Sequence, residues 1–182
     1  MMHTEEKYRR LGSLLPQFRS SLGVDDRAAR RLLLEIDITS DIEFSRNRSN
    51  YFTYLCRRVT GRLYERMGSP KDLGAAIFSY EKASRSAYML GNYRAKLTLK
   101  KKILELKKKI DPGENVAYAN FFLADALIDL RRLPEAHEAL EEGIKEFGGS
   151  DKLPNAEAIR NILGRYHSTR KHLKYQGLVA KI

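Results

Sequence analysis

Apolar residues recur with a helical period over the C-terminal part of the chain. From residue 73 onward they return every three or four positions, and the strict alternation that is typical of strands is absent. Gly91-Asn92 and Asp111-Pro112-Gly113 interrupt the pattern with residues that end helices, and Gly148-Gly149-Ser150 begins a longer loop. The pattern therefore predicts five helices, over residues 73–90, 93–110, 114–130, 134–147 and 154–170.

The first 72 residues carry a weaker helical pattern. Thr4 is placed to cap a first helix that bends or ends near Pro16, and Asp25 or Asp26 to cap a second. Residues 40–43, Ser-Asp-Ile-Glu, have the spacing of a capping box and predict a long helix over residues 41–67. The apolar residues of that helix recur as one buried stripe of Phe52, Leu55, Val59, Leu63 and Met67.

A step of 40 residues relates three segments of the chain to one another. Tyr80, Ala83, Ser84 and Ala87 are followed, one step later, by Asn120, Leu123, Ala124 and Leu127, and after another step by Arg160, Leu163, Gly164 and His167. A small residue therefore recurs in register as Ser84, Ala124 and Gly164. A second register is open, because residues 76–83 also read as the second helix of a pair.

Residues 117–147, and LPEAHEALEEGIKEF at 133–147 above all, resemble one helix-turn-helix unit of the tetratricopeptide repeat family. The family's unit is about 34 residues long, and Lys96 stands where the family has a small residue such as Ala136. The resemblance covers about residues 73–175 and implies an all-α fold of antiparallel helix pairs stacked as a short solenoid. We expect residues 73–182 to form the repeats and residues 1–72 to form an N-terminal helical region packed with them as one domain.

In proteins that resemble this family, the first helix of each pair lines a concave groove that holds a ligand. One stripe along each such helix gives the expected groove residues Phe78, Glu81, Arg85, Tyr88, Tyr118, Phe121, Asp125, Asp129, Asn161 and Arg165, with Ile128 and Ser168 on the same stripes. Asp125 lies on an otherwise apolar helix, where a buried unpaired carboxylate would cost several kcal/mol. An open groove, or an ion pair with Arg85 or Arg165, would remove that cost.

Charge is distributed unevenly along this basic chain, whose formal net charge is +11. Residues 114–153 are acidic, whereas residues 71–113 and 154–182 are basic, so self-association through opposite charges is one option. A cluster of cations on the helix at 93–110 forms a candidate basic patch for an acidic segment or for phosphates: Arg94, Lys101, Lys102, Lys108 and Lys109.

These features favour an interaction scaffold that binds a peptide or helix of another protein in a helical groove, the partner segment being acidic in one version. The alternative is a nucleic-acid-associated or regulatory protein that places basic helices on phosphates, although no aromatic residues interleave with the lysines for base stacking.

The sequence offers little for catalysis, a metal or a cofactor, and we expect none of the three. His167 and His172 are five residues apart and do not share a helix face, and no Gly-rich phosphate loop occurs. Cys56 is the only cysteine, which suits a reducing compartment. No apolar run approaches the length of a membrane span, so we expect a cytoplasmic protein without membrane contact.

Overall fold

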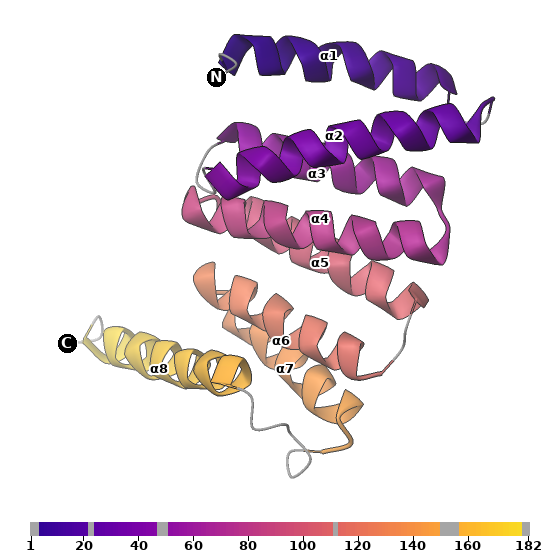
Figure 1. Cartoon of the computed structure of the whole chain (residues 1–182). Coiled ribbons are helices and arrows are strands. Elements are labelled where there is room, and N and C mark those ends of the chain that lie inside the picture. Colours follow the sequence, from indigo (N-terminus) through magenta and orange to yellow (C-terminus); the bar gives the residue numbers. More distant parts are fainter. Residues whose placement is uncertain (1–3, 22–23, 47–50, 111–112, 150–156, 180–182) are drawn as a thin grey trace. The chain divides into compact units, whose positions relative to one another are not determined.

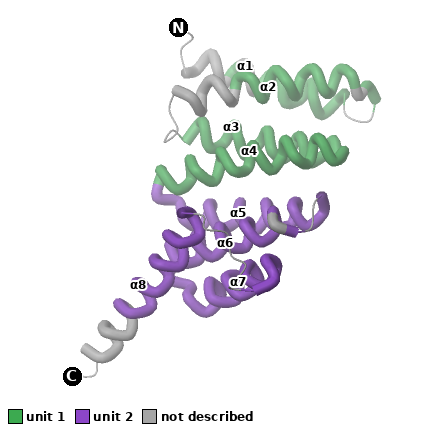
Figure 2. The backbone as a smooth tube through the Cα atoms, turned by 60° about the horizontal axis from the view of Figure 1, so that its bottom comes forward, with its two compact units in different colours: residues 1–90 green, residues 91–182 purple. Residues whose placement is uncertain are grey.

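The computed structural model describes residues 4–21, 24–46, 51–110, 113–149 and 157–179 (Figure 1). These residues form eight α-helices and no strand, which confirms the all-α prediction. The chain divides into two compact units, residues 1–90 and residues 91–182, each described by itself below (Figure 2).

Unit 1 contains four helices, each of which packs against the next along the chain: α1 (Thr4–Ser21), α2 (Asp26–Arg46), α3 (Tyr51–Met67) and α4 (Pro70–Met89). The α3–α4 contact is the most extensive in the molecule. At its centre a Cβ on Gly61 would lie only 2.5 Å from Cε1 of Tyr80, so the missing side chain lets the two helices approach. The core of unit 1 consists of Leu14, Phe18, Ala29, Leu33, Ile36, Phe52, Cys56 and Leu63.

Polar contacts join the helices of unit 1. Arg57 is fully buried on α3 and donates to Asp37 on α2 at 2.8 Å, and the Tyr64 hydroxyl donates to the same carboxylate at 2.7 Å. Burial and that hydrogen bond raise the pKa of Tyr64 above its usual range. Arg30 on α2 holds Asp72 at the start of α4 with two hydrogen bonds, at 2.8 and 3.0 Å.

Helix boundaries in unit 1 differ from the sequence prediction in two places. The predicted helix over residues 41–67 is wrong, because α2 runs to Arg46 and α3 begins at Tyr51. Residues 40–43 therefore lie inside α2 and do not begin a helix, whereas Asp25 caps α2 by accepting from the backbone N–H groups of Arg27 and Ala28. Helix α1 continues through Pro16 to Ser21.

Unit 2 contains α5 (Tyr93–Ile110), α6 (Glu114–Asp129), α7 (Leu133–Glu146) and α8 (Glu157–Val179). Helix α6 contacts each of the other three. This arrangement explains why α6 is apolar almost all round. The core of unit 2 consists of Leu97, Phe121, Ala124, Ala126, Leu127, Ile128, Ala136, Ala139, Leu140, Ile159, Ile162 and Tyr166.

Helices α6 and α7 form the pair that the resemblance predicted at residues 117–147. A three-residue turn joins them, and a Cβ on Gly143 would lie 2.9 Å from the ring of Phe121. Ala136 is fully buried, so both small residues lie where the helices are close. Gly164 does not continue this pattern, because it is exposed and a Cβ there would meet nothing within 4 Å.

The first expected pair, residues 73–90 with 93–110, is divided between the units. Helix α4 makes its main contact with α3 and belongs to unit 1, whereas α5 belongs to unit 2. Residues 76–83 are thus part of the second helix of the α3–α4 hairpin, as in the alternative alignment of the repeat in which these residues belong to the second helix of a pair. The expected regional boundary at residue 72 falls near the start of α4, while the units meet at Leu90 and Gly91.

Candidate partner-binding groove

The expected groove residues of unit 1 lie along one surface of α4. Phe78 and Tyr88 expose 55% and 46% of their side chains, and Arg85 is exposed as well. Glu81 is half-buried, and Nζ of Lys82 lies 4.1 Å from the centre of the Phe78 ring. Within unit 1 these residues follow one side of α4, and three of the four are exposed.

Two expected groove residues of unit 2 are structural. Phe121 is fully buried in the core against Gly143, so its assignment to a groove is wrong. Tyr118 is half-buried and meets the Phe147 ring edge-on, with ring centres 5.3 Å apart. Both side chains lie on the face of α6 that packs toward α7. Asn161 is exposed on α8.

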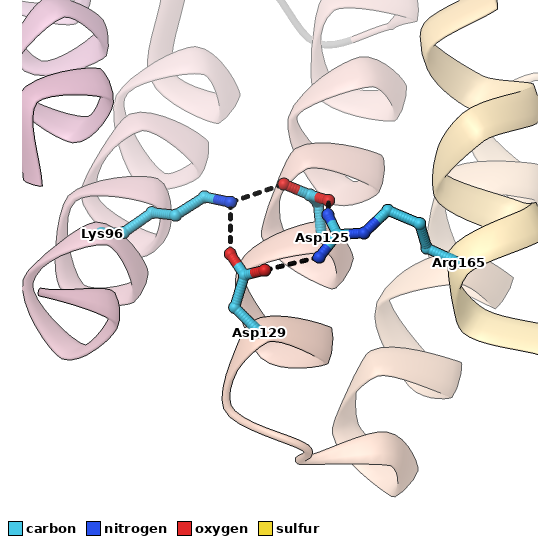
Figure 3. Close-up of polar contacts among 4 residues, drawn as sticks. All are labelled: Lys96, Asp125, Asp129 and Arg165. Atoms are coloured by element: carbon cyan, nitrogen blue, oxygen red, sulfur yellow. Dashed lines mark hydrogen bonds and ion pairs between the residues drawn. The ribbon is translucent and has the colours of Figure 1, made fainter. Parts of the chain in front are cut away.

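Asp125 and Asp129 take part in one four-residue charge cluster. They lie one helical turn apart on α6, between Lys96 on α5 and Arg165 on α8 (Figure 3). Nζ of Lys96 lies 2.5 Å from Asp125 and 2.6 Å from Asp129. Arg165 bonds Asp125 through Nη1 and Asp129 through Nη2, the latter at 2.5 Å. Of the alternatives that the sequence left open for Asp125, the structure has the ion pair with Arg165.

The charge cluster is electrically balanced, and three of its four side chains are shielded from water, whereas Arg165 exposes 43% of its side chain. Two carboxylates face two cations, and the exposed fractions of the side chains are 7% for Lys96 and 5% for Asp129. Buried charges are stable only when they are paired and hydrogen-bonded, and here each carboxylate receives both cations. The cluster therefore fixes α8 and α5 against α6.

Lys96 was not predicted to lie in this cluster. It was noted only as a departure from the repeat pattern, at a position where a small residue was expected. The signal was present in that departure, because a lysine at a position that should be buried needs carboxylate partners, and two aspartates one turn apart on the next helix provide them.

A groove of about 410 Å³ lies beside the charge cluster, between the C-terminal end of α6 and the middle of α8. The lining residues from α6 and the turn after it are Ile128, Asp129 and Arg131. Those from α8 and the start of α5 are Arg165, Ser168, Thr169, His172 and Tyr93. Four of these, Ile128, Asp129, Arg165 and Ser168, lie on the stripes that the sequence predicted.

Arg131 is the most unusual residue of the groove. It adopts a left-handed conformation, with φ of 56°, and is the only non-glycine residue with positive φ in the described part of the chain. Its N–H bonds the carbonyl of Ile128, and the N–H of Arg132 bonds that of Leu127, so Arg131 occupies the capping position that glycine usually takes. Gly91, with φ of 69°, holds the same position after α4.

The predicted basic patch lies on α5 with its charge partly compensated. Arg94, Lys101, Lys108 and Lys109 are exposed and Lys102 is half-buried. Glu105 accepts from Lys109 at 2.9 Å and from Lys102 at 3.2 Å, and these hydrogen bonds hold the pKa of Glu105 below its usual range. The patch therefore presents less positive charge than its sequence suggests.

Within the residues that the structure covers, no three His, Cys, Asp or Glu side chains gather as metal ligands would. None of the described helices combines the length and apolarity that crossing a bilayer requires. Cys56 is buried in the core of unit 1.

Comparison of the chain with protein-family models, with curated proteins and with solved structures found no match. The resemblance to tetratricopeptide repeats thus rests on the residues quoted for it and stays a prediction.

Proposed function

We propose that the chain is a non-catalytic interaction module that binds a segment of a partner protein in the groove of unit 2. The observation that carries the proposal is the groove itself, whose lining combines an apolar residue, Ile128, with charged and hydroxyl-bearing side chains. Its volume of about 410 Å³ is within the range of specific ligand sites. A cytoplasmic location and a tetratricopeptide-like architecture are part of the same proposal.

The charge cluster supports this role by giving the groove a rigid wall. Arg165 lines the groove, while its guanidinium is held by Asp125 and Asp129. A binding residue whose orientation is fixed in advance loses little conformational freedom when a ligand arrives, and affinity rises accordingly. The groove therefore suits a partner segment with mixed apolar and charged residues.

Site-specific photo-crosslinking tests the proposal directly. A photoreactive amino acid at Ser168, on the groove wall, should form a covalent adduct that maps to one segment of one partner protein. The same amino acid at Glu138, exposed on α7, serves as the matched control and should not capture that segment.

The segment identified in this way then allows a measurement of affinity. Ser168→Trp, which fills the groove, should weaken its binding at least about tenfold, equivalent to about 1.4 kcal/mol. Glu138→Trp should leave binding within about twofold. Equal effects of the two substitutions, or no effect of either, would place the partner on another surface.

The second proposal is a nucleic-acid-associated role for the basic patch, favoured by the exposure of Arg94, Lys101, Lys108 and Lys109 on one helix. Reversing Lys101 and Lys108 to Glu should then reduce affinity for duplex DNA and flatten its dependence on salt, because phosphate contacts release counterions. The same double variant should bind the groove partner unchanged. If the double variant loses affinity for the groove partner as well as for DNA, both ligands bind at the basic patch.

A further inference from the structure

The groove of unit 2 carries one positive charge that the fold does not use. Arg165 and Asp129 are balanced by Lys96 and Asp125 within the charge cluster. Arg131 makes no ion pair with any described residue. Its guanidinium is exposed and lines the groove. A ligand in this groove therefore meets an uncompensated cation.

The conformation of Arg131 supports a role in binding. A left-handed residue other than glycine costs on the order of 1 kcal/mol, and such strain is typically found where function requires a particular side chain. Gly91 shows that the chain uses glycine at the corresponding position after α4. An arginine that replaces glycine here adds strain to the fold and a cation to the groove.

Hydroxyl donors face the same space from α8. Ser168 and Thr169 line the groove, and within the described part of the chain neither side chain makes a hydrogen bond. His172, one turn further along, is exposed at the same wall. Because α8 is held to α6 by Arg165, these donors have fixed positions relative to Arg131.

We propose that this groove recognises a phosphorylated side chain on the partner segment, an inference that rests on the proposed function. Arg131 forms the ion pair with the phosphoryl group, and the Ser168 and Thr169 hydroxyls donate to its oxygens. A phosphoryl group has three strong acceptor oxygens and nearly two negative charges, so it matches a set of one free cation and several separate donors. A carboxylate has only two oxygens and one charge, so it would accept fewer hydrogen bonds from these donors and pair less strongly with Arg131.

The surroundings favour a single phosphoryl group over a nucleic acid. Asp129 lies in the groove wall, and α7, which begins two residues after Arg131, carries five glutamates from Glu135 to Glu146. A polyanion that extended from the groove along α7 would meet these like charges. A peptide with one phosphorylated residue and apolar neighbours would instead place its apolar side chains toward Ile128 and Tyr93.

The test uses the full-length chain and three short peptide libraries that share the same random flanking residues. One library has phosphothreonine at its centre, one has threonine and one has glutamate, and binding is followed by fluorescence anisotropy. The phosphothreonine library should bind at least about tenfold more tightly than the other two, as one charged hydrogen-bonded contact provides. Arg131→Gly should remove this preference, while Arg160→Gln, which deletes an exposed cation of α8 outside the groove, should keep it.

Loss of the phosphothreonine preference in Arg131→Gly would not be due to unfolding of the variant. The substitution relieves the left-handed strain and should not lower the melting temperature. Three results would each overturn the inference. The three libraries could bind with equal affinity, the glutamate library could bind as tightly as the phosphothreonine library, or the preference for phosphothreonine could survive Arg131→Gly. Displacement of the phosphopeptides by short single-stranded DNA at equal concentration would overturn it as well. If the partner crosslinks at Ser168 equally well after phosphatase treatment, the proposed function stands and the phosphoryl inference falls. If no segment crosslinks at Ser168, nor from a photoreactive amino acid at His172, a groove residue that is not one of the proposed phosphoryl donors, both fall.

Discussion

Gly143 and Gly164 both lie in helices of unit 2, but only Gly143 lies where a neighbour occupies the place of its missing side chain. A Cβ at Gly143 would lie 2.9 Å from the Phe121 ring and 3.3 Å from the backbone oxygen of Ala117. Phe121 is fully buried and has little room to move. Gly143→Ala should therefore overpack the α6–α7 contact and lower the free energy of unfolding by about 1–3 kcal/mol.

Gly164→Ala is the matched control for that substitution. A Cβ there meets nothing within 4 Å, and alanine is the better helix former, so the free energy of unfolding should rise by about 0.5–1 kcal/mol. Urea denaturation of both variants measures the two changes. Effects of the same sign would contradict the close approach of α6 and α7 at Gly143.

The left-handed conformation of Arg131 leads to a second residue-scale prediction. Arg131→Gly should raise the free energy of unfolding by roughly 0.5–1 kcal/mol, because glycine adopts positive φ without steric cost. Gly91→Ala, at the corresponding position after α4, should lower it by about 1 kcal/mol. Thermal denaturation of the two variants would show opposite shifts, and a destabilised Arg131→Gly would contradict the strain at this turn.

At the scale of helices, the charge cluster is the main polar link between α5, α6 and α8. Lys96→Met leaves Asp125 and Asp129 with Arg165 alone, and removing one partner from a buried ionic group should cost about 3 kcal/mol. Lys101→Met, an exposed lysine of the same helix, should cost under about 0.5 kcal/mol. Equal costs in urea denaturation would show that the cluster does not hold α5.

The link between α2 and α4 in unit 1 should make stability depend on pH. Burial raises the pKa of Asp72, but the hydrogen bonds from Arg30 and Ser69 outweigh it and hold the pKa below its ordinary value. A carboxyl group with a lowered pKa in the folded state stabilises the fold above its unfolded pKa of about 4, and that stabilisation is lost as the pH falls through the folded pKa.

Asp72→Asn is the variant that reveals this contribution. The difference in unfolding free energy between the wild-type chain and Asp72→Asn should be largest near neutral pH and should shrink as the pH is lowered below about 4. A difference that stays constant from neutral to acidic pH would mean that the Asp72 carboxylate is not stabilised by Arg30.

The sequence predicted α5, α6 and α7 well because their ends carry strong local signals, whereas α8 runs nine residues beyond its predicted end at residue 170, to Val179. Gly91-Asn92 and Pro134 mark boundaries that hold within about two residues, and α5 begins and ends where it was predicted. The division between α2 and α3 was missed because no Gly or Pro marks it, and the capping-box spacing at residues 40–43 occurs inside a helix. Local signals therefore determined which boundaries could be predicted.

The candidate site was predictable only in part, for a physical reason. The sequence indicated that Asp125 needs a cation or an open groove, because it is a carboxylate on an apolar helix, but it did not choose between Arg85 and Arg165 as the partner. The place of Lys96 in the charge cluster depends on which helices become neighbours, and the groove role of Arg131 depends on the geometry of one turn. Helical periodicity contains neither kind of information. Phe121 was misplaced because an aromatic residue on an apolar helix serves a groove or a core equally well by pattern alone.

At the scale of the whole molecule, the expected groove residues separate into two sets. Phe78, Arg85 and Tyr88 belong to unit 1, and Asp129 and Arg165 belong to unit 2. Unit 2 brings charged, hydroxyl-bearing and apolar side chains together around a cavity. We therefore expect the partner to bind unit 2, and such a partner need not touch α4.

The most direct test of this assignment is a nuclear magnetic resonance titration of the full-length chain with the partner segment that crosslinks at Ser168. The largest amide shift changes should fall on residues 128–131 at the end of α6 and on residues 165–172 of α8, which line the groove. Smaller changes are expected at Phe78, Arg85 and Tyr88. If the largest changes fall instead on α4, or on the lysines of α5, the groove of unit 2 is not the binding site.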